Sequence, residues 1–428
     1  MARARGSSSS MALAFETIYG LIPVSGFKKV PFVSSALGEQ QDLIKPNILG
    51  LGRDPQTPSR DVINNDGDLV VPIDLRNFGI FLKLLLGAPT TTQGVAATGS
   101  IAFSAQPAAT SKITINGTDF TFVSASPGAT DVLIGATLKA TVANAVRALN
   151  ASADVGVAAA TYSTDDDGTT IYITHDTIGT AGNSFTLVAG GTPSPNATVS
   201  DATLAGGATT GAYNHVFVSG ASTLPSAAIE VGFPEVPSYG VNYGAVADKL
   251  AIQMQRSGLL DATVSMICQG EKVFSSSQAG TPSEAALKPF TQFTGAVLRA
   301  GVPVADVVNA NFTYANNFDK VEVIRRDGRI GGADPGEIEI TGQMVVRFGD
   351  DDLTSLARAG DPIDLLYGWK IADGEELRFA LHDVYLSNPK RPAEGAGGVQ
   401  ATIDWRGAKN ATIGRAMTVT LINDVASY

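Results

Sequence analysis

The chain has little of the chemistry that disulfides and metal centres require. Its 428 residues include one cysteine, Cys268, and three histidines, His175, His215 and His382, which lie far apart in the sequence. One cysteine cannot form a disulfide within the chain or supply a cysteine-based zinc site. Three scattered histidines leave little for a histidine-rich metal centre. We therefore expect no bound metal and no cofactor.

Basic charge and long apolar runs are also scarce. The chain has 30 Lys and Arg against 41 Asp and Glu, a net charge of −11, and no basic run that would hold nucleic acid through its phosphates. The longest apolar stretch, residues 78–88, is interrupted by Lys83 and is too short to span a bilayer. The first residues lack the apolar core of a signal peptide. We expect a soluble protein made and folded in a reducing cytoplasm.

The composition changes in the middle of the chain. Residues 95–210 are rich in Ala, Thr, Gly and Ser, contain no Glu, Trp or Met, and carry three basic residues against eight aspartates. Threonine-rich segments, TTTQGVAATGS and LAGGATTGAY, flank this region and resemble linkers. The pattern predicts a domain at 95–210 that is inserted into a host domain made of residues 1–94 and 211–428.

The insert has the pattern of a small α+β unit. KITINGTDFTFV alternates around Asn116-Gly117, a strong hairpin signal, and the apolar residues of 138–149 recur at helical spacing. Two further strands are expected on either side of the acidic turn at residues 165–168. That turn is either solvated or a calcium loop, although the bidentate Glu of an EF-hand loop is missing. Nothing in the insert indicates catalysis.

The host is predicted to be mainly β with one or two short helices. After a strand at residues 68–73, Asp74 is placed to cap a helix with an apolar stripe. A similar succession of acidic turn, strand, cap and helix recurs at residues 333–360, which suggests a weak internal duplication. Further strands are expected at residues 377–386, 399–407 and 416–424.

Two predicted hairpins each have one apolar and one polar face. The first spans residues 248–271, and the second pairs 319–326 with 337–348. A shift of one residue in either strand would exchange its faces, so both orientations stay open. Long strands also need something that covers or continues their edges. The residues expected on the polar faces are Lys249, Gln253, Gln255, Thr263, Ser265, Glu337, Glu339, Thr341 and Gln343.

Motifs of catalysis are missing from the sequence. No GxGxxG follows a strand, and there is no P-loop, HExxH or GxSxG. The paired acidic residues Glu375 and Glu376 fall in a predicted turn, where solvation explains them. We expect no enzyme.

Several phrases, in order, resemble a known family. FKKVPFVSSALGEQQDLI, GLGRDPQTPSRDV, DGDLVVPIDLRNFGIFLKLLLG and, after the insert, LPSAAIEVGFPEVPSYGVNYGAVADKLAIQMQRSGLLDATVSMICQGE are similar to the tail tube proteins of long-tailed, siphovirus-like bacteriophages. The insert resembles a small domain of phage structural proteins. This resemblance implies a β-sandwich or barrel-like subunit that forms rings, typically hexameric, stacked into a hollow tube.

The resemblance also implies roles for particular residues and partners. The polar residues of the two hairpins become candidates for lining the lumen, through which DNA passes without specific binding. Arg53, Asp54 and Arg60 become candidates for contacts between rings, and the insert is expected on the outer surface. The implied partners are further copies of the chain, a tape measure protein, and tail terminator and distal tail proteins, all in the virion. The alternative is a secreted or surface-displayed β-sandwich module for binding or adhesion.

Overall fold

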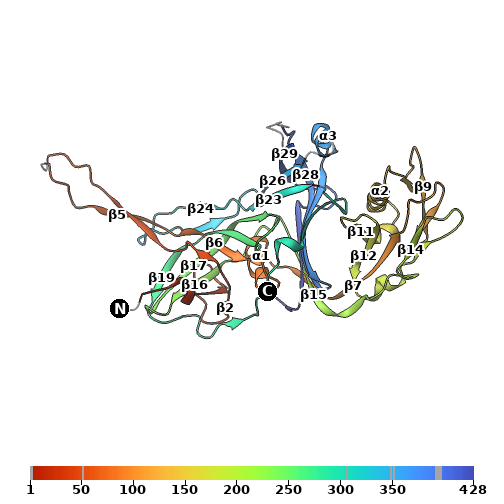
Figure 1. The fold of residues 1–428 in the computed structure, drawn as a ribbon. Coiled ribbons are helices and arrows are strands. Elements are labelled where there is room, and N and C mark those ends of the chain that lie inside the picture. The colour runs from red at the N-terminus through yellow and green to blue at the C-terminus, as the bar shows by residue number, and fades with distance from the viewer. Residues whose placement is uncertain (1–2, 51–52, 305, 348, 350–351, 391–397) are drawn as a thin grey trace.

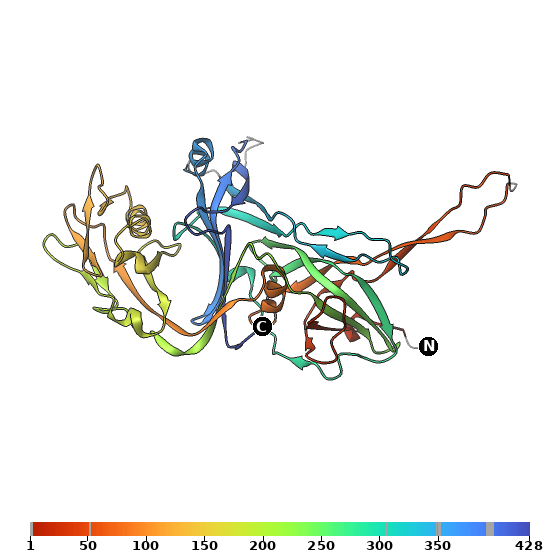
Figure 2. The ribbon, with the colours of Figure 1, turned by 180° about the vertical axis from the view of Figure 1, so that it is seen from behind.

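The chain is mainly β and elongated, with a long hairpin at one end and the insert at the other (Figures 1 and 2). The structure, a computed structural model, describes residues 3–50, 53–304, 306–347, 349, 352–390 and 398–428. Its α-helices are α1 (Phe78–Leu86), α2 (Leu138–Asn150) and α3 (Asp352–Ala359). The predicted fold class is confirmed, although the described strands of one chain do not close into a barrel.

One long strand, β17 (Ser238–Met254), belongs to two groups of strands. Its first half lies between β16 (Ala227–Phe233) and β19 (Gly270–Phe274). Its second half lies between β18 (Asp261–Ile267) and β23 (Val307–Ala315). The hairpin of β17 and β18 confirms the first predicted hairpin. Beyond β16 the first group continues through β1 (Ser10–Phe15), β2 (Lys28–Lys29) and β20 (Ser283–Glu284).

The second group forms a broad antiparallel wall. Starting from β3 (Ser34–Ser35) at one edge, its strands continue through β6 (Asp66–Pro72), β18, β17, β23, β26 (Glu339–Arg347) and β29 (Gln400–Ala408), and the end of β28 (Glu375–Leu386) pairs with β29 beyond them. Side chains alternate between a buried and a more exposed face along each strand, as the pleat requires. The wall is therefore half of a sandwich.

A second layer packs on the buried face of the wall. Phe312 of β23 lies with its ring centroid 5.1 Å from that of Tyr367 and 4.9 Å from that of Phe379. These two rings belong to β27 (Ile363–Ala372) and β28 (Glu375–Leu386). The layer also includes β21 (Gly295–Arg299), β22 (Val302–Pro303) and β30 (Met417–Asn423). The strands β28, β29 and β30 confirm the three strands predicted near the C-terminus.

Helix α1 fills the centre of the host. Every residue of α1 except Lys83 is buried, and the helix packs against β17 and β15. Asp74 is fully buried, and its carboxylate accepts hydrogen bonds from the backbone N–H groups of Asn77 and Phe78 at 2.6 and 3.1 Å. Asp74 thus caps the turn at residues 75–77 that leads into α1, and its carboxylate satisfies N–H groups at the start of the helix, as predicted.

The insert has a hydrophobic core of its own. Two strands that also belong to the host carry the chain into and out of it, β7 (Thr90–Phe103) and β15 (Ala208–Val218). The buried residues of its core all lie between Ala97 and Leu204, whereas the host core has none in that range. α2 and the Asn116-Gly117 hairpin lie where they were predicted. Its other strands are β8 (Lys112–Ile115), β9 (Thr118–Val123), β10 (Asp131–Leu133), β11 (Ala160–Ser163), β12 (Thr170–Ile178), β13 (Leu187–Ala189) and β14 (Ala197–Val199). The boundaries at 94 and 210 remain a prediction.

Two small hairpins lie apart from the layers. β4 (Gln40–Ile44) and β5 (Ser59–Asn64) form the long projecting arm seen in Figure 1. β24 (Asp319–Val321) pairs with β25 (Gly332–Asp334). The predicted pairing of 319–326 with 337–348 was therefore wrong. The partner of β26 is β23, whose own alternation of polar and apolar residues extends the wall, while residues 319–334 turn back on themselves.

The host consists of two copies of one strand arrangement. In the first copy β1 pairs with β2 and β16, β17 pairs with β16, β18 and β19, β6 pairs with β3 and β18, and β4 pairs with β5. The second copy repeats these pairings, and its strands follow one another along the chain in the same order. β21 to β26 correspond to β1 to β6, and β27 to β30 correspond to β16 to β19. We call the two copies the first and second units.

The two units also match in detail. A β-bulge lies between Ala227 and Ile229 where β16 faces β17, and between Ile363 and Leu365 where β27 faces β28. Gly67 of β6 and Gly342 of β26 occupy matching positions, facing Met266 and Trp405. The insert interrupts the first unit between α1 and β16, whereas α3 is followed directly by β27. The strand pairings therefore support the duplication suggested by the sequence and extend it to all the strands named above, whereas β7, β15 and β20 have no counterpart in the second unit.

Candidate lumen face

The exposed face of the wall brings together most of the predicted lumen residues. On this face Lys249 lies opposite Ser265 on one side and Ala315 on the other, and Ala315 lies opposite Glu339. A second row runs through Thr263, Ala251, Thr313, Thr341 and Arg406, and a third through Gln253, Asn311, Gln343 and Asp404. The strands of two separately predicted hairpins thus form one continuous surface.

In the strands of both predicted hairpins, the residues expected on the polar face lie on the more exposed side, so neither strand has its faces exchanged. Leu250, Ile252 and Met344 are buried in the host core, whereas Lys249 and Gln253 are exposed. Two candidates lie beyond the strands: Gln255 is in the turn after β17, and Glu337 precedes β26. The other seven candidates share one face. Whether that face lines a lumen remains a prediction.

Other residues of this face were not predicted. Asn311 and Thr313 come from β23, Asp404 and Arg406 from β29, and Asp68 from β6. The signal was in the sequence, because residues 307–315 and 400–406 alternate polar and apolar side chains in the same way as the predicted strands. We use the name polar face for the surface formed by Asp68, Lys249, Gln253, Thr263, Ser265, Asn311, Thr313, Glu339, Thr341, Gln343, Asp404 and Arg406.

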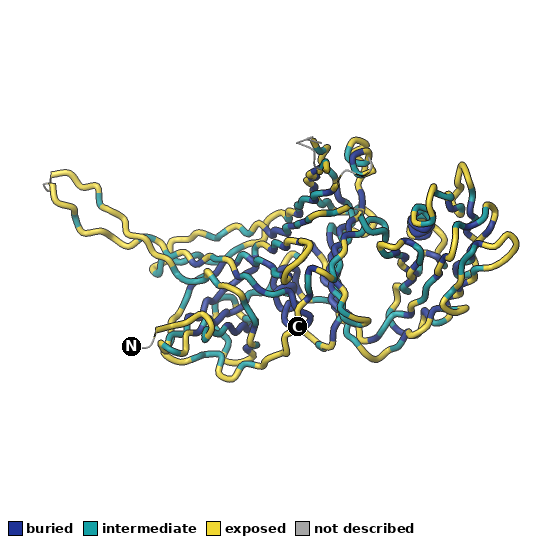
Figure 3. The backbone as a smooth tube through the Cα atoms, viewed as in Figure 1, coloured by how far each residue is buried: buried dark blue, intermediate teal, exposed yellow. Residues whose placement is uncertain are grey.

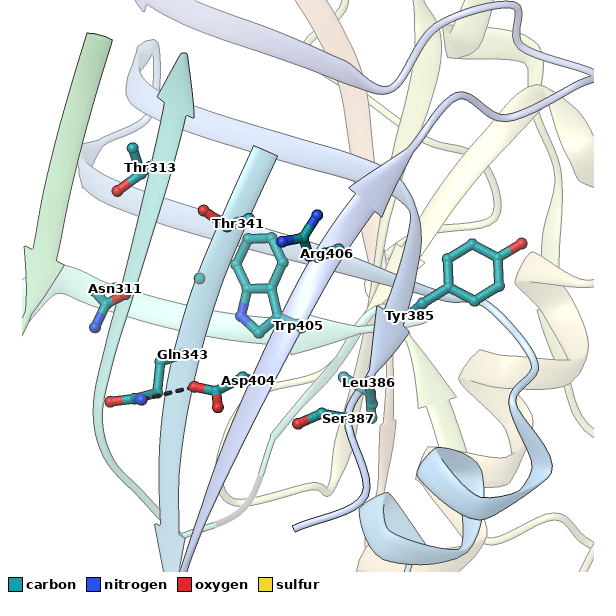
Figure 4. Close-up of a pocket in the computed structure, with 11 residues that line it drawn as sticks. Asn311, Thr313, Thr341, Gln343, Tyr385, Leu386, Ser387, Asp404, Trp405 and Arg406 are labelled. Carbon is teal, nitrogen blue, oxygen red and sulfur yellow. Dashed lines mark hydrogen bonds between the residues drawn. The ribbon is translucent and has the colours of Figure 1, made fainter. Parts of the chain in front are cut away.

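Charges on the polar face are nearly balanced and largely partnered. Arg406 lies 3.3 Å from Glu339, with both side chains well exposed. Gln343 Nε2 donates a hydrogen bond to Asp404 Oδ1 at 2.7 Å (Figure 4). Ser265 Oγ donates to Asp68 Oδ1 at 2.6 Å. Exposed ion pairs of this kind contribute little to stability, but they leave the surface without a basic patch.

A shallow depression lies where β26, β28 and β29 meet on this face. Asn311, Gln343, Asp404 and Arg406 surround it, and Trp405 lies against Gly342 at its base (Figure 4). Tyr385 and Ser387 border it on the side of β28. The described residues contain no group of three or more His, Cys, Asp or Glu that could hold a metal. The depression offers polar contacts but no cluster of catalytic groups.

The predicted ring contacts lie on the projecting arm. Arg60 is part of β5, and Arg53 and Asp54 lie near its tip; all three are exposed. The arm also exposes large apolar side chains, including Leu43 at 65%, Ile48 at 60% and Leu49 at 91% (Figure 3). An extended arm with apolar side chains in water is typical of a surface that another molecule covers.

The buried titratable groups of the host have structural roles. Burial raises the pKa of the Cys268 thiol, which is 1% exposed, and so makes it unreactive. Burial also lowers the pKa of His215, whose ring contacts Thr91, Asn423 and the Val425 carbonyl.

Among the described residues, no helix is long and apolar enough to cross a membrane.

A comparison with known families gives the class of this protein. Residues 6–407 match the family described as Phage tail tube protein. The match includes the first unit, the insert and the second unit up to β29, so the chain belongs to the phage tail tube protein family. A search of curated proteins gave no match.

Membership of this family gives the protein a structural role in the virion tail. Members assemble with other tail proteins into a tube, and the family is typically without enzymatic activity. The chain is thus a component of a tail, in agreement with the resemblance found in the sequence.

Proposed function

We propose that copies of this chain form closed rings, which the resemblance implies are typically hexameric, and that these rings stack into a tube whose lumen is lined by the polar face. The observation that carries the proposal is the wall itself. Its six strands from β6 to β29 bury one face in the core and leave a continuous polar face opposite. Repetition of this wall around a ring would close a barrel and remove its strand edges.

The charge on the polar face supports passage of DNA without binding. Tight nucleic-acid binding depends on basic side chains that neutralise phosphates. Here the two basic residues of the face, Lys249 and Arg406, lie among Asp68, Glu339 and Asp404, and Arg406 is paired with Glu339. Genomic DNA would therefore slide along the lumen into the host cell.

The insert is proposed to lie on the outer surface of the tube. It contacts the host at the turn between β21 and β22, where Thr164 N–H donates to the Gly301 carbonyl at 3.0 Å and Asn150 Nδ2 to the Ala300 carbonyl at 3.2 Å. That turn belongs to the layer behind the wall, away from the polar face. An inserted domain there leaves the lumen open.

The remaining parts of the proposal follow from the role in a tail. The arm with Arg53, Asp54 and Arg60 would contact the neighbouring ring, and a tape measure protein would occupy the lumen before DNA does. Tail terminator and distal tail proteins would meet the two ends of the tube. The protein would be made in the cytoplasm of the infected bacterium and would have no catalytic activity. Family membership favours this role over a secreted or surface-displayed adhesion module.

Chemical labelling of assembled tubes tests the lumen assignment. Gln253→Cys should react with a bulky maleimide in the dissociated chain but should be protected in tubes. Val155→Cys, on the insert and 86% exposed, should react in both states. The buried Cys268 gives no background. Equal labelling of Gln253→Cys in tubes and in dissociated chains would show that the polar face does not line the lumen.

A further inference from the structure

The two units of one chain are already joined edge to edge. Residues 249–254 of β17, in the first unit, pair antiparallel with residues 310–315 of β23, in the second unit. This internal junction makes the strands β6, β18 and β17 continuous with β23, β26 and β29. A chain therefore contains one complete example of how two units connect.

The two strands of this junction, β17 and β23, each have a counterpart in the other unit. Among the described residues, each counterpart has a neighbouring strand on one side only. The counterpart of β23 is β3 together with the residues that follow it, up to Gln40. A Cβ on Gly67 would meet the Ala36 carbonyl oxygen as a Cβ on Gly342 would meet that of Asn311, so Ala36 matches Asn311. β3 pairs with β6, whereas β23 pairs with both β26 and β17.

The other open edge follows the end of β28. The bulges match Ala245 of β17 to Val384 of β28, so residues 385–390 correspond to 246–251. Tyr385 and Leu386 pair with β29, and Ser387 N–H donates to the Asp404 carbonyl at 2.8 Å. The opposite side of this segment has no strand among the described residues, although β23 fills that place in the first unit.

Backbone groups at the β3 edge are held by side chains in the single chain. Asn316 N–H donates to the Asp248 carbonyl in the internal junction, so alternate N–H groups of β23 point toward β17. The matching groups of the β3 edge include Leu37 and Glu39. Leu37 N–H reaches Ser35 Oγ at 3.4 Å, and Glu39 N–H donates to Glu271 Oε2 at 3.0 Å. Both groups bond to side chains and not to a strand, so pairing with a neighbouring strand would exchange these side-chain oxygens for backbone carbonyls.

We propose that residues 386–390 of one chain pair antiparallel with residues 38–42 of a second copy, in the register of the internal junction. That register places Asn388 opposite Gln40 and Lys390 opposite Gly38. This inference rests on the proposed ring and specifies its contacts. Each chain then contributes two units to the ring, so a ring holds half as many chains as units. Six units around the ring, the number in a hexamer of single-unit chains, correspond to three chains.

The junction between chains is weaker than the internal one. Pro389 stands where Leu250 stands in β17, so its carbonyl can accept the Glu39 N–H but the residue has no N–H to donate. Asn388 and Lys390 take the positions of Lys249 and Ala251 and so face the lumen. Rings should therefore separate between chains before the two units of one chain separate.

Disulfide cross-linking tests this register. Asn388 and Gln40 correspond to Lys249 and Ala315, a non-hydrogen-bonded pair whose Cα separation of about 4.5 Å suits a disulfide. Tubes of the double variant Gln40→Cys/Asn388→Cys, oxidised and then dissolved without reductant, should give a ladder of covalent oligomers. The last band of the ladder should count half as many chains as the units seen around the ring in averaged end views.

Three controls make the result specific. Lys249→Cys/Ala315→Cys should form its disulfide within one chain and give no ladder, which shows that the geometry is suitable. Gln40→Cys/Ser387→Cys, one residue out of register and on opposite faces, should give little cross-linking, and each single variant should give none. Tubes in which the internal pair oxidises but Gln40→Cys/Asn388→Cys stays at single-chain mass overturn the junction, as does a ladder that ends at one chain per unit. A wild-type protein that forms neither rings nor tubes in micrographs overturns the proposed function itself.

Discussion

At the scale of single residues, two glycines allow the wall to pack. A Cβ on Gly342 would lie 2.4 Å from the Asn311 carbonyl oxygen and 2.2 Å from a ring carbon of Trp405. A Cβ on Gly67, at the matching position, would lie 2.4 Å from the Ala36 carbonyl oxygen. The same requirement in both units shows that β6 and β26 approach their neighbours in the same way.

Substitution of Gly342 should therefore destabilise the host. We expect Gly342→Ala to lower the free energy of unfolding by about 1–3 kcal/mol, because both the backbone of β23 and the indole of Trp405 must move. Urea denaturation followed by tryptophan fluorescence measures this. Gly368→Ala is the control, since its nearest neighbours would lie 3.8 Å from the new Cβ, and it should change stability by less than about 0.5 kcal/mol. Equal effects of the two variants would contradict the packing argument.

At the scale of elements, the end of the chain is fixed to β15 and β7 by one neutral histidine. His215 of β15 is fully buried, its Nδ1 lies 2.9 Å from Thr91 Oγ1 of β7, and its Nε2 lies 2.8 Å from the Val425 carbonyl. Its ring also meets that of Tyr428 at a centroid distance of 4.9 Å. The contact to a carbonyl oxygen requires Nε2 to donate. Burial lowers the pKa of His215 and so favours the neutral ring, in which Nδ1 accepts from the Thr91 hydroxyl.

This arrangement predicts a loss of stability in mild acid. Burial lowers the pKa of His215 below its usual 6.5, so below about pH 6.5 the unfolded chain binds a proton that the folded chain does not. The free energy of unfolding should fall as the pH drops from 7 through this range. His215→Gln should show a smaller fall when denaturation is measured at several pH values, with pH 8 as the reference. A residual fall is expected from His382, whose pKa is also lowered by burial. An unchanged pH dependence would contradict the role of His215.

The arm formed by β4 and β5 supports a prediction on assembly. It extends away from both layers, and its apolar side chains Leu43, Ile48 and Leu49 are exposed. We expect replacement of residues 46–57 by a short Gly-Ser linker to leave the fold and the rings intact and to shorten or abolish tubes in negative-stain micrographs. Circular dichroism should show no loss of strand structure. Tubes of normal length would show that the arm does not join rings.

At the scale of the whole molecule, two units and one insert give three bodies in one chain. In the part of the chain that the structure describes, the host core and the insert core share no buried residue, and only Val302 of the host packs against the insert core as a partly buried neighbour. Gln93 and Tyr213 lie opposite each other on β7 and β15 at the base of the insert. The insert is therefore attached to a hairpin whose two strands are already paired.

Removal of the insert should leave a folded and assembling protein. Residues 94–212 would be replaced by Asn-Gly, which joins Gln93 to Tyr213 as a two-residue hairpin turn. We expect the melting temperature of the host to change by only a few degrees and tubes to form with a smaller outer diameter and an unchanged lumen. Differential scanning calorimetry and electron microscopy measure these. An unfolded product would show that the boundaries at 94 and 210 do not separate domains, and a wider lumen would show that the insert projects inward.

The sequence predicted local structure well where a pattern is local. The Asn116-Gly117 hairpin, α1 with its Asp74 cap and the hairpin of β17 and β18 depend on neighbours within a few residues or on one turn. The pairing of β26 failed because the nearest alternating segment, residues 319–326, is not its partner. β26 pairs with β23 and β29 because this pairing buries Phe312, Met344 and Trp405 in one common core, a long-range property that a local pattern does not show.

The candidate lumen face shows the same division. Alternation along each strand identified Lys249, Gln253, Thr341 and Gln343 as polar-face residues, because a strand exposes every second side chain. It could not show that these residues share a face, since the strand that joins them, β23, lies more than fifty residues after β17 in the chain.

By itself, then, the sequence determined the class of fold, the family, a change of composition at residues 95–210 and a first sign of duplication, since periodicity, composition and turn residues are properties of short segments. Only the tertiary structure decided that the duplication spans most strands of the host, that one wall contains strands of both units, and that two strand edges remain without a partner strand in the described chain. These are properties of long-range pairing, in which backbone hydrogen bonds and burial of a common core select one partner among many segments with the same pattern.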